Sequence, residues 1–178
     1  MTDDLLSPRA RAFAVHYREL LPKGDIPLRS AFDVGILRHI IESFAIVEVE
    51  GPDMVRYRLV GAREVQRYGR NITGENYLDF CPPDRRVAAH AAFHNMSIYP
   101  CGMQAVIQSR TNVTFDLTNE AVGFPFRCDK TGKVHLIFQS NDLDRDTQWA
   151  NTEVSVRSHS SISRRVYLDV GFGIPPQA

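Results

Sequence analysis

The sequence predicts a single α+β domain with helices on one face of a five-stranded antiparallel sheet. Three observations predict this class: two short strand-like segments near residues 45–60, a helical connection up to residue 98, and alternating segments again from residue 103. Helices and strands are thus segregated along the chain, which is typical of α+β domains. The length of 178 residues suits one domain with short extensions.

The composition is that of an ordinary globular protein. Hydrophobic residues make up 43% and charged residues 24% of the chain, which argues against wholesale disorder. Lys plus Arg and Asp plus Glu both number 21, so the basic excess typical of nucleic-acid-binding proteins is missing. No apolar segment is long enough to span a bilayer, and the N-terminus lacks a secretory signal. We therefore expect a cytoplasmic protein with neither a nucleic-acid nor a membrane partner.

An N-terminal helix is predicted from Ser7, a capping residue, followed by Pro8 at the first helical position. Its apolar residues recur at helical spacing until Pro22 ends the helix. This stripe has two interpretations of similar weight: it packs on its own domain, or it forms the contact of a homodimer of moderate strength. The candidate interface residues are Phe13, Tyr17, Leu20 and Leu21.

The next segments predict a short helix and a hairpin. The segment 34–41 places its aliphatic residues on one face of a helix. Residues 45–49 form an apolar segment, and residues 55–60 alternate between apolar and charged side chains. The turn at 51–53 joins these two strands.

The connection to the second half of the chain is predicted to be helical. Residues 62–68 form a helix closed by Gly69, and Thr73 is a candidate cap for a short helix over residues 75–80. A longer helix begins near Pro83 and ends at about residue 98. Four of its residues fall near one face, and these are Val87, Ala91, His94 and Ile98.

The second half of the chain has the alternating pattern of strands. The turn at 129–132 predicts a hairpin. The strand candidates are residues 103–111, 113–117 as a continuation or a separate strand, 122–128, 134–139 and 166–170.

The segment 157–165, RSHSSISRR, is polar and basic. It could contact an anion or an acidic partner, but we favour a solvated surface, because most such runs are solvated.

The stretch from Val55 to Phe80, VRYRLVGAREVQRYGRNITGENYLDF, resembles a bacterial subfamily of PAS domains common in alphaproteobacteria. Its members show a tyrosine-rich strand ending in R-L-x-G, a short helix ending in glycine, and a turn of the type [D/N]-[L/I]-T-G. The matching features here are Tyr57, Arg58–Gly61, Gly69 and Asn71–Gly74. The resemblance covers roughly residues 25–141, with a helical extension at 1–24 before it and a further extension at 142–178.

This resemblance implies a sensory or regulatory domain that binds a small ligand between its sheet and helices, or docks on a partner protein. With no length left for an effector module, the chain looks like a stand-alone protein that signals through a partner or a homodimer by population shift. Its cofactor, if any, is unknown. Ala91→Trp is expected to fill the cavity. The candidate lining residues are Tyr68, Tyr77, Phe80, Phe93, His94, Ile107 and Phe138.

Two alternative functions remain open. His90 and His94 share a helix face and are candidate ligands of a haem or a metal ion, although packed or half-exposed histidines are the commoner case. A small cone-fold enzyme is the second alternative, and it would need an Asp–His or Tyr–Asp dyad facing a deep pocket. Motifs for nucleophilic catalysis and phosphate binding are absent, so we predict no catalytic residues. The cysteines at 81, 101 and 128 are too widely spaced for a zinc site.

Overall fold

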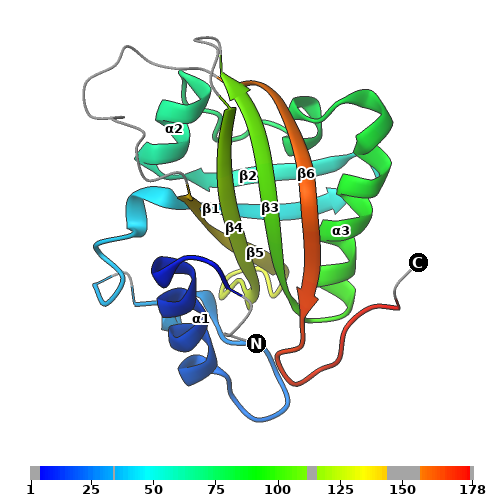
Figure 1. Ribbon diagram of the computed structural model, residues 1–178. Helices are drawn as coiled ribbons and strands as arrows, with labels where there is room; N and C mark the ends of the chain where they lie inside the picture. Colours follow the sequence, from blue (N-terminus) through cyan, green and yellow to red (C-terminus); the bar gives the residue numbers. More distant parts are fainter. Residues whose placement is uncertain (1–4, 34, 112–115, 144–156, 177–178) are drawn as a thin grey trace.

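The computed structural model describes residues 5–33, 35–111, 116–143 and 157–176 (Figure 1). Among these residues, no helix has both the length and the apolar character needed to cross a membrane. The helices are α1 (Pro8–Leu20), α2 (Ala62–Tyr68) and α3 (Arg86–Ile98), with short 3-10 turns η1 (Arg29–Ala31), η2 (Ile41–Ser43), η3 (Tyr77–Phe80) and η4 (Pro83–Arg85). The strands are β1 (Phe44–Gly51), β2 (Met54–Val60), β3 (Gly102–Thr111), β4 (Asp116–Arg127), β5 (Val134–Asp142) and β6 (Arg157–Leu168).

The strands form one antiparallel sheet in the order β2-β1-β5-β4-β3-β6. The α+β class is confirmed, but the sheet has six strands where we predicted five. The additional strand, β6, runs along β3 (Figure 1). It contains the segment 157–165 that we expected to be a solvated surface, and the strand that we placed at 166–170 ends at Leu168. The polar side chains of this strand lack the apolar alternation from which a strand is predicted. A strand at a sheet edge is held by backbone hydrogen bonds and does not need that pattern.

Both faces of the sheet are covered. As expected, α2, α3 and the turns beside them pack on one face, and their core includes Val47, Tyr57 and Leu136. Helix α1 covers the opposite face, where its core includes Phe124 and Ile137. Successive residues of a strand point to opposite faces, so the helices on the two sides together bury both rows of the central strands.

Helix α1 begins as its sequence predicts. The Ser7 hydroxyl accepts a hydrogen bond from the amide of Ala10 at 3.0 Å, and Pro8 occupies the first turn. The buried Glu120 carboxylate on β4 accepts hydrogen bonds from the amides of Leu6 and Ser7, each at 2.8 Å. These contacts fix the start of α1 on the sheet, because a carboxylate pairs well with the free amides at a helix N-terminus.

Two local predictions need correction. The segment 35–43 forms turns and the 3-10 helix η2 where we expected an α-helix, and Val34 lies outside the described residues. The short helix η3 is capped by Asn76, which accepts from the amide of Leu78, and not by Thr73. Asn76 directly precedes η3, so its side chain is close enough to accept a hydrogen bond from an amide of the first turn.

A charged cluster lies on the α1 side of the sheet, at the hairpin end of β5. The Glu48 carboxylate contacts Arg58 Nε at 2.7 Å and Lys133 Nζ at 2.9 Å. His135 Nε2 lies 3.3 Å from the same carboxylate. Burial lowers the pKa of His135, and the charge of Glu48 offsets only part of this effect. Protonation at low pH would add a buried donor at Nδ1, an atom with no partner among the described residues.

The free energy of unfolding should therefore fall as the pH drops below about 6.5, the ordinary histidine pKa. Because the pKa of His135 is lower in the folded state, the unfolded chain takes up the proton first and gains stability. The variant His135→Gln should lose less stability than the wild type between pH 7.5 and 5.5 in urea denaturation. An equal loss would show that His135 does not titrate against folding.

Candidate functional site

A cavity lies between the sheet and the helices α2, η3, η4 and α3. It has an inner part of about 90 Å³ and an outer pocket of about 360 Å³. The two parts lie next to each other, because five residues border both: Tyr68, Tyr77, Ile107, Ile162 and Arg165. The outer volume lies within the range of about 300–1,000 Å³ that small-molecule sites occupy.

Small residues on both walls leave the inner space open. The sheet wall contributes Ala45 from β1, Ala105 from β3 and Ala121 from β4, and α3 contributes Ala92. On β4, Gly123 pairs with Phe138 of β5. A Cβ atom at Gly123 would lie 2.3 Å from the Phe138 ring, so this ring keeps its position over the sheet only because glycine stands there.

Aromatic rings from the helical side and from β5 line the cavity. The ring centroids of Tyr77 and Phe93 lie 4.8 Å apart, and those of Phe93 and Phe138 lie 5.5 Å apart. At the other end, Tyr68 and Phe80 lie 4.8 Å apart. Edge-to-face packing of this kind is favourable beyond the area that it buries. Burial raises the pKa of Tyr77, so its hydroxyl stays neutral and can donate a hydrogen bond.

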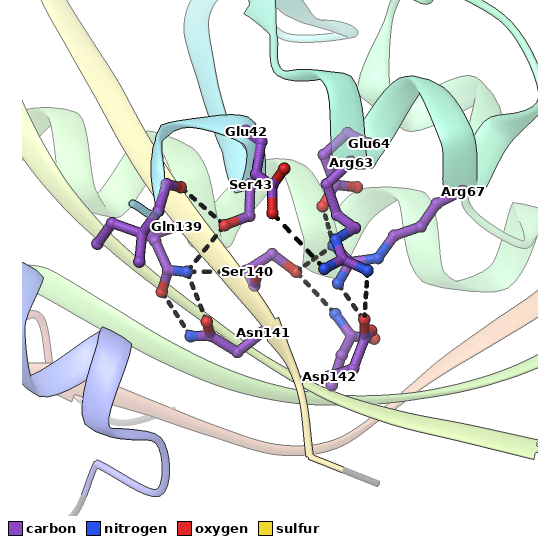
Figure 2. Close-up of polar contacts among 11 residues, drawn as sticks. Glu42, Ser43, Arg63, Glu64, Arg67, Gln139, Ser140, Asn141 and Asp142 are labelled. Carbon is purple, nitrogen blue, oxygen red and sulfur yellow. Dashed lines mark hydrogen bonds and ion pairs between the residues drawn. The ribbon is translucent and has the colours of Figure 1, made fainter. Parts of the chain in front are cut away.

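A buried ionic network closes the far end of the inner cavity (Figure 2). Arg67 of α2 is 2% exposed, and it pairs with Glu64 on the same helix and with Asp142 of β5 at 2.7 Å. Its Nη1 also donates to Ser140 Oγ at 2.9 Å. Glu64 and Ser140 both border the cavity. The network therefore joins α2 to the end of β5 next to the cavity wall.

Arginines surround the outer pocket. Arg85, Arg164 and Arg165 border it, whereas Asp84 is the single acidic residue among its lining residues. The Cys81 thiol also borders this pocket, and burial raises its pKa. An unreactive, protonated thiol is the expected state for such a cysteine.

The structure brings together six of the seven predicted lining residues. Five border the outer pocket or the inner cavity from the helices and β3, and Phe138 borders the inner cavity from β5. His94 is the exception, because it is exposed on α3. Ala91 is also exposed, so Ala91→Trp would not fill the cavity as we expected.

Both errors come from the rotation of α3. The helix buries Ala89, Ala92, Phe93 and Met96, and it exposes Val87 and Ile98. The sequence of α3 contains two apolar stripes with helical spacing. The buried stripe is the one with the larger side chains, Phe93 and Met96.

The predicted dimer residues lie mostly in the core of their own chain. Phe13 and Tyr17 are fully buried against the sheet, and Leu20 and Leu21 are half-buried beside the same cluster. A contact between copies through Phe13 or Tyr17 would require α1 to leave the sheet. A homodimer stays a prediction, and with α1 in place only Leu20 and Leu21 of these four residues are accessible for it.

The two histidines proposed as haem or metal ligands lie away from the cavity. His90 and His94 stack with ring centroids 5.7 Å apart, and His90 Nε2 lies 2.7 Å from the backbone oxygen of Gly51. Neither borders the inner cavity or the outer pocket. The described residues contain no group of three or more side chains suited to a metal ion.

Sequence reasoning missed the wall that β6 contributes. Ile162 pairs with Ile107, and Arg165 pairs with Ala105. The two β6 residues are three positions apart, whereas their partners on β3 are two positions apart. A bulge at Ser163 shifts the register between these pairs. Both side chains therefore reach the cavity, which strict alternation along the strand would not predict.

Residues 6–138 match a family model described as PAS domain. Among curated proteins, no sequence matches the chain.

Several solved structures share part of this architecture. The Rhodobacter sphaeroides LOV protein is 14% identical, with a TM-score of 0.45 over 62% of this chain and 66% of that chain. This chain therefore spans just under two thirds of that protein. A fungal LOV domain photoreceptor is 17% identical, with a TM-score of 0.46 over 74% and 90%. The PAS-B domain of a Drosophila melanogaster Cycle variant with bound glycerol is 10% identical, with a TM-score of 0.42 over 56% and 97%.

Proposed function

Because this chain belongs to the PAS domain family, we propose that it is a sensory domain that binds a small, largely apolar molecule in the cavity between its sheet and helices. The observation that carries this proposal is the cavity with its adjacent parts of about 90 Å³ and 360 Å³, lined by aromatic rings and kept open by alanines. Such cavities, with few polar groups among apolar ones, are the usual form of a ligand site.

The walls of this cavity suit a sensor, because they belong to different layers. An occupant would touch Phe138 on the sheet, Phe93 on α3 and Tyr68 on α2 at once. A ligand that prefers one spacing of these layers shifts the population toward that packing. The Arg67 network would carry a movement of α2 to the end of β5. A partner protein that receives the signal is part of the same proposal.

Ligand binding can be tested with N-phenyl-1-naphthylamine, a neutral probe that fluoresces in apolar sites. The wild type should bind it, and Ala88→Trp should weaken binding about tenfold or more, because Ala88 borders the outer pocket and tryptophan would fill part of it. Ala91→Trp is the matched control on the same helix, since Ala91 is exposed and borders neither part of the cavity.

The proposal fails if the wild type does not bind the probe, or if both tryptophan variants bind it as well as the wild type. Mass spectrometry of small molecules extracted from the purified protein would identify a natural occupant. An absorbance spectrum of the same sample would separate a haem or a flavin from a colourless ligand.

A further inference from the structure

The outer pocket carries a cation whose hydrogen-bonding capacity is not used by the protein. The Nη1 of Arg165 donates to the backbone oxygen of Ala88 at 3.2 Å, and its Nε is buried with no hydrogen-bond partner among the described residues. Among the described residues, no carboxylate lies within ion-pair distance of the Arg165 guanidinium. A guanidinium has five N–H donors, so Arg165 has several left for an occupant of the cavity.

The contrast with Arg67 shows what a structural arginine looks like in this fold. Arg67 pairs with Glu64 and Asp142 and also donates to Ser140. Arg67 reaches the cavity wall only through Glu64 and Ser140, whereas Arg165 borders the cavity itself and has no acidic partner among the described residues. Arg165 is half-buried, but its Nε is buried without a partner, and such a group is costly, so a binding role gives a physical reason for keeping Arg165 at this place.

The bulge in β6 points Arg165 at the cavity. Its pairing with Ala105 puts the side chain on the same sheet face as Ile107, where it borders both the outer pocket and the inner cavity. Its charge already acts on the groups there. Burial raises the pKa of Tyr77, and the positive charge of Arg165 opposes this rise.

We propose that the ligand of this cavity is an amphipathic organic anion, a carboxylate whose head group pairs with Arg165 and whose apolar body enters the aromatic cavity. This inference rests on the proposed function and names the chemical class of its ligand. Arg164 adds to the positive potential of the pocket, whereas Arg85 lies 3.6 Å from the Asp84 carboxylate and offsets its charge. A planar carboxylate matches the fork of a guanidinium with two parallel hydrogen bonds.

The family match does not supply this anion site. It ends at Phe138, whereas the wall with Arg165 belongs to β6, residues 157–168. The aromatic part of the cavity comes from within the matched residues, so the apolar and anionic parts of the site have separate origins in the chain.

The test compares decanoate with decanol, which share an apolar chain and differ in the charge of the head group. In displacement of N-phenyl-1-naphthylamine at low salt and neutral pH, decanoate should compete at about tenfold lower concentration than decanol with the wild type. Arg165→Gln should remove this preference and keep decanol binding. Arg165→Lys should restore part of it, because the charge returns without the planar fork.

Arg9→Gln is the matched control, because it removes the same charge from an exposed arginine on α1, which covers the other face of the sheet and borders neither part of the cavity. It should keep the preference for decanoate. The inference is overturned if the wild type binds both compounds equally, or if Arg9→Gln and Arg165→Gln reduce the preference to the same extent.

A second measurement separates this inference from the proposed function. The melting temperature of the wild type should rise more with decanoate than with decanol, and this shift does not depend on the fluorescent probe. If neither compound shifts the melting temperature and the probe does not bind, both proposals fail. If the probe and decanol bind but decanoate has no advantage, the cavity binds ligands and only the anion inference fails.

Discussion

Replacing Phe13 with alanine is expected to lower the free energy of unfolding by about 3–5 kcal/mol, the usual cost of deleting a buried aromatic ring. Phe13 is fully buried, and its ring meets Phe44 and Phe124 at centroid distances of 5.0 and 5.2 Å. The ring thus joins α1 to β1 and β4 across the sheet face. The change can be measured by urea denaturation followed by circular dichroism.

Val15→Ala on the same helix is the control for this variant. Val15 is 45% exposed, so its truncation should change the free energy of unfolding by less than about 1 kcal/mol. Light scattering of both variants adds a second readout. If Phe13→Ala kept the stability of the wild type but halved its mass in solution, the stripe on α1 would be a contact between copies after all.

Replacing Arg67 with leucine should cost a similar amount, about 3–5 kcal/mol, for a different reason. Burial disfavours the charge of Arg67, but Glu64 and Asp142 more than compensate, so the pKa of Arg67 is raised. Without the guanidinium, these two carboxylates would lie close together with little access to water. The comparison variant is Arg63→Leu, because Arg63 lies 3.6 Å from Glu42 and 3.8 Å from Asp142 and is partly exposed (Figure 2). It should cost less than about 1 kcal/mol.

Adding Glu64→Gln and Asp142→Asn to Arg67→Leu tests the electrostatic explanation. Removing all three charges should recover part of the lost stability, because no uncompensated carboxylate remains. If the triple variant were as unstable as Arg67→Leu alone, lost packing and not unpaired charge would explain the effect.

The parts of the fold that the sequence predicts well are those with strong local signals. The hairpin around Gly132 follows from turn residues, and the 3-10 turn η4, which leads directly into α3, begins at the predicted Pro83 because proline favours a first helical turn. The burial of Tyr77 and Phe138 follows from their apolar character. These features depend on a few neighbouring residues, so a single sequence is enough to predict them.

The remaining features depend on residues distant in the sequence. The row with Ile137 on β5 is buried only because α1 covers it. The direction of Arg165 depends on a bulge whose register is set by β3. The partners of Arg67 lie up to 75 residues away. No local pattern reports any of these contacts, so they required the structure.

The docking of α1 on the central strands has a consequence for the order of folding during synthesis. The amides of Leu6 and Ser7 meet the Glu120 carboxylate across 114 and 113 residues, and the Tyr17 hydroxyl meets the backbone oxygen of Pro125 across 108. At about 5–20 residues per second, the helix emerges from the ribosome on the order of 5–25 s before its binding surface exists. During this interval Phe13 and Tyr17 form an unprotected apolar stripe that chaperones can bind. The segment made first is thus among the last to reach its native contacts.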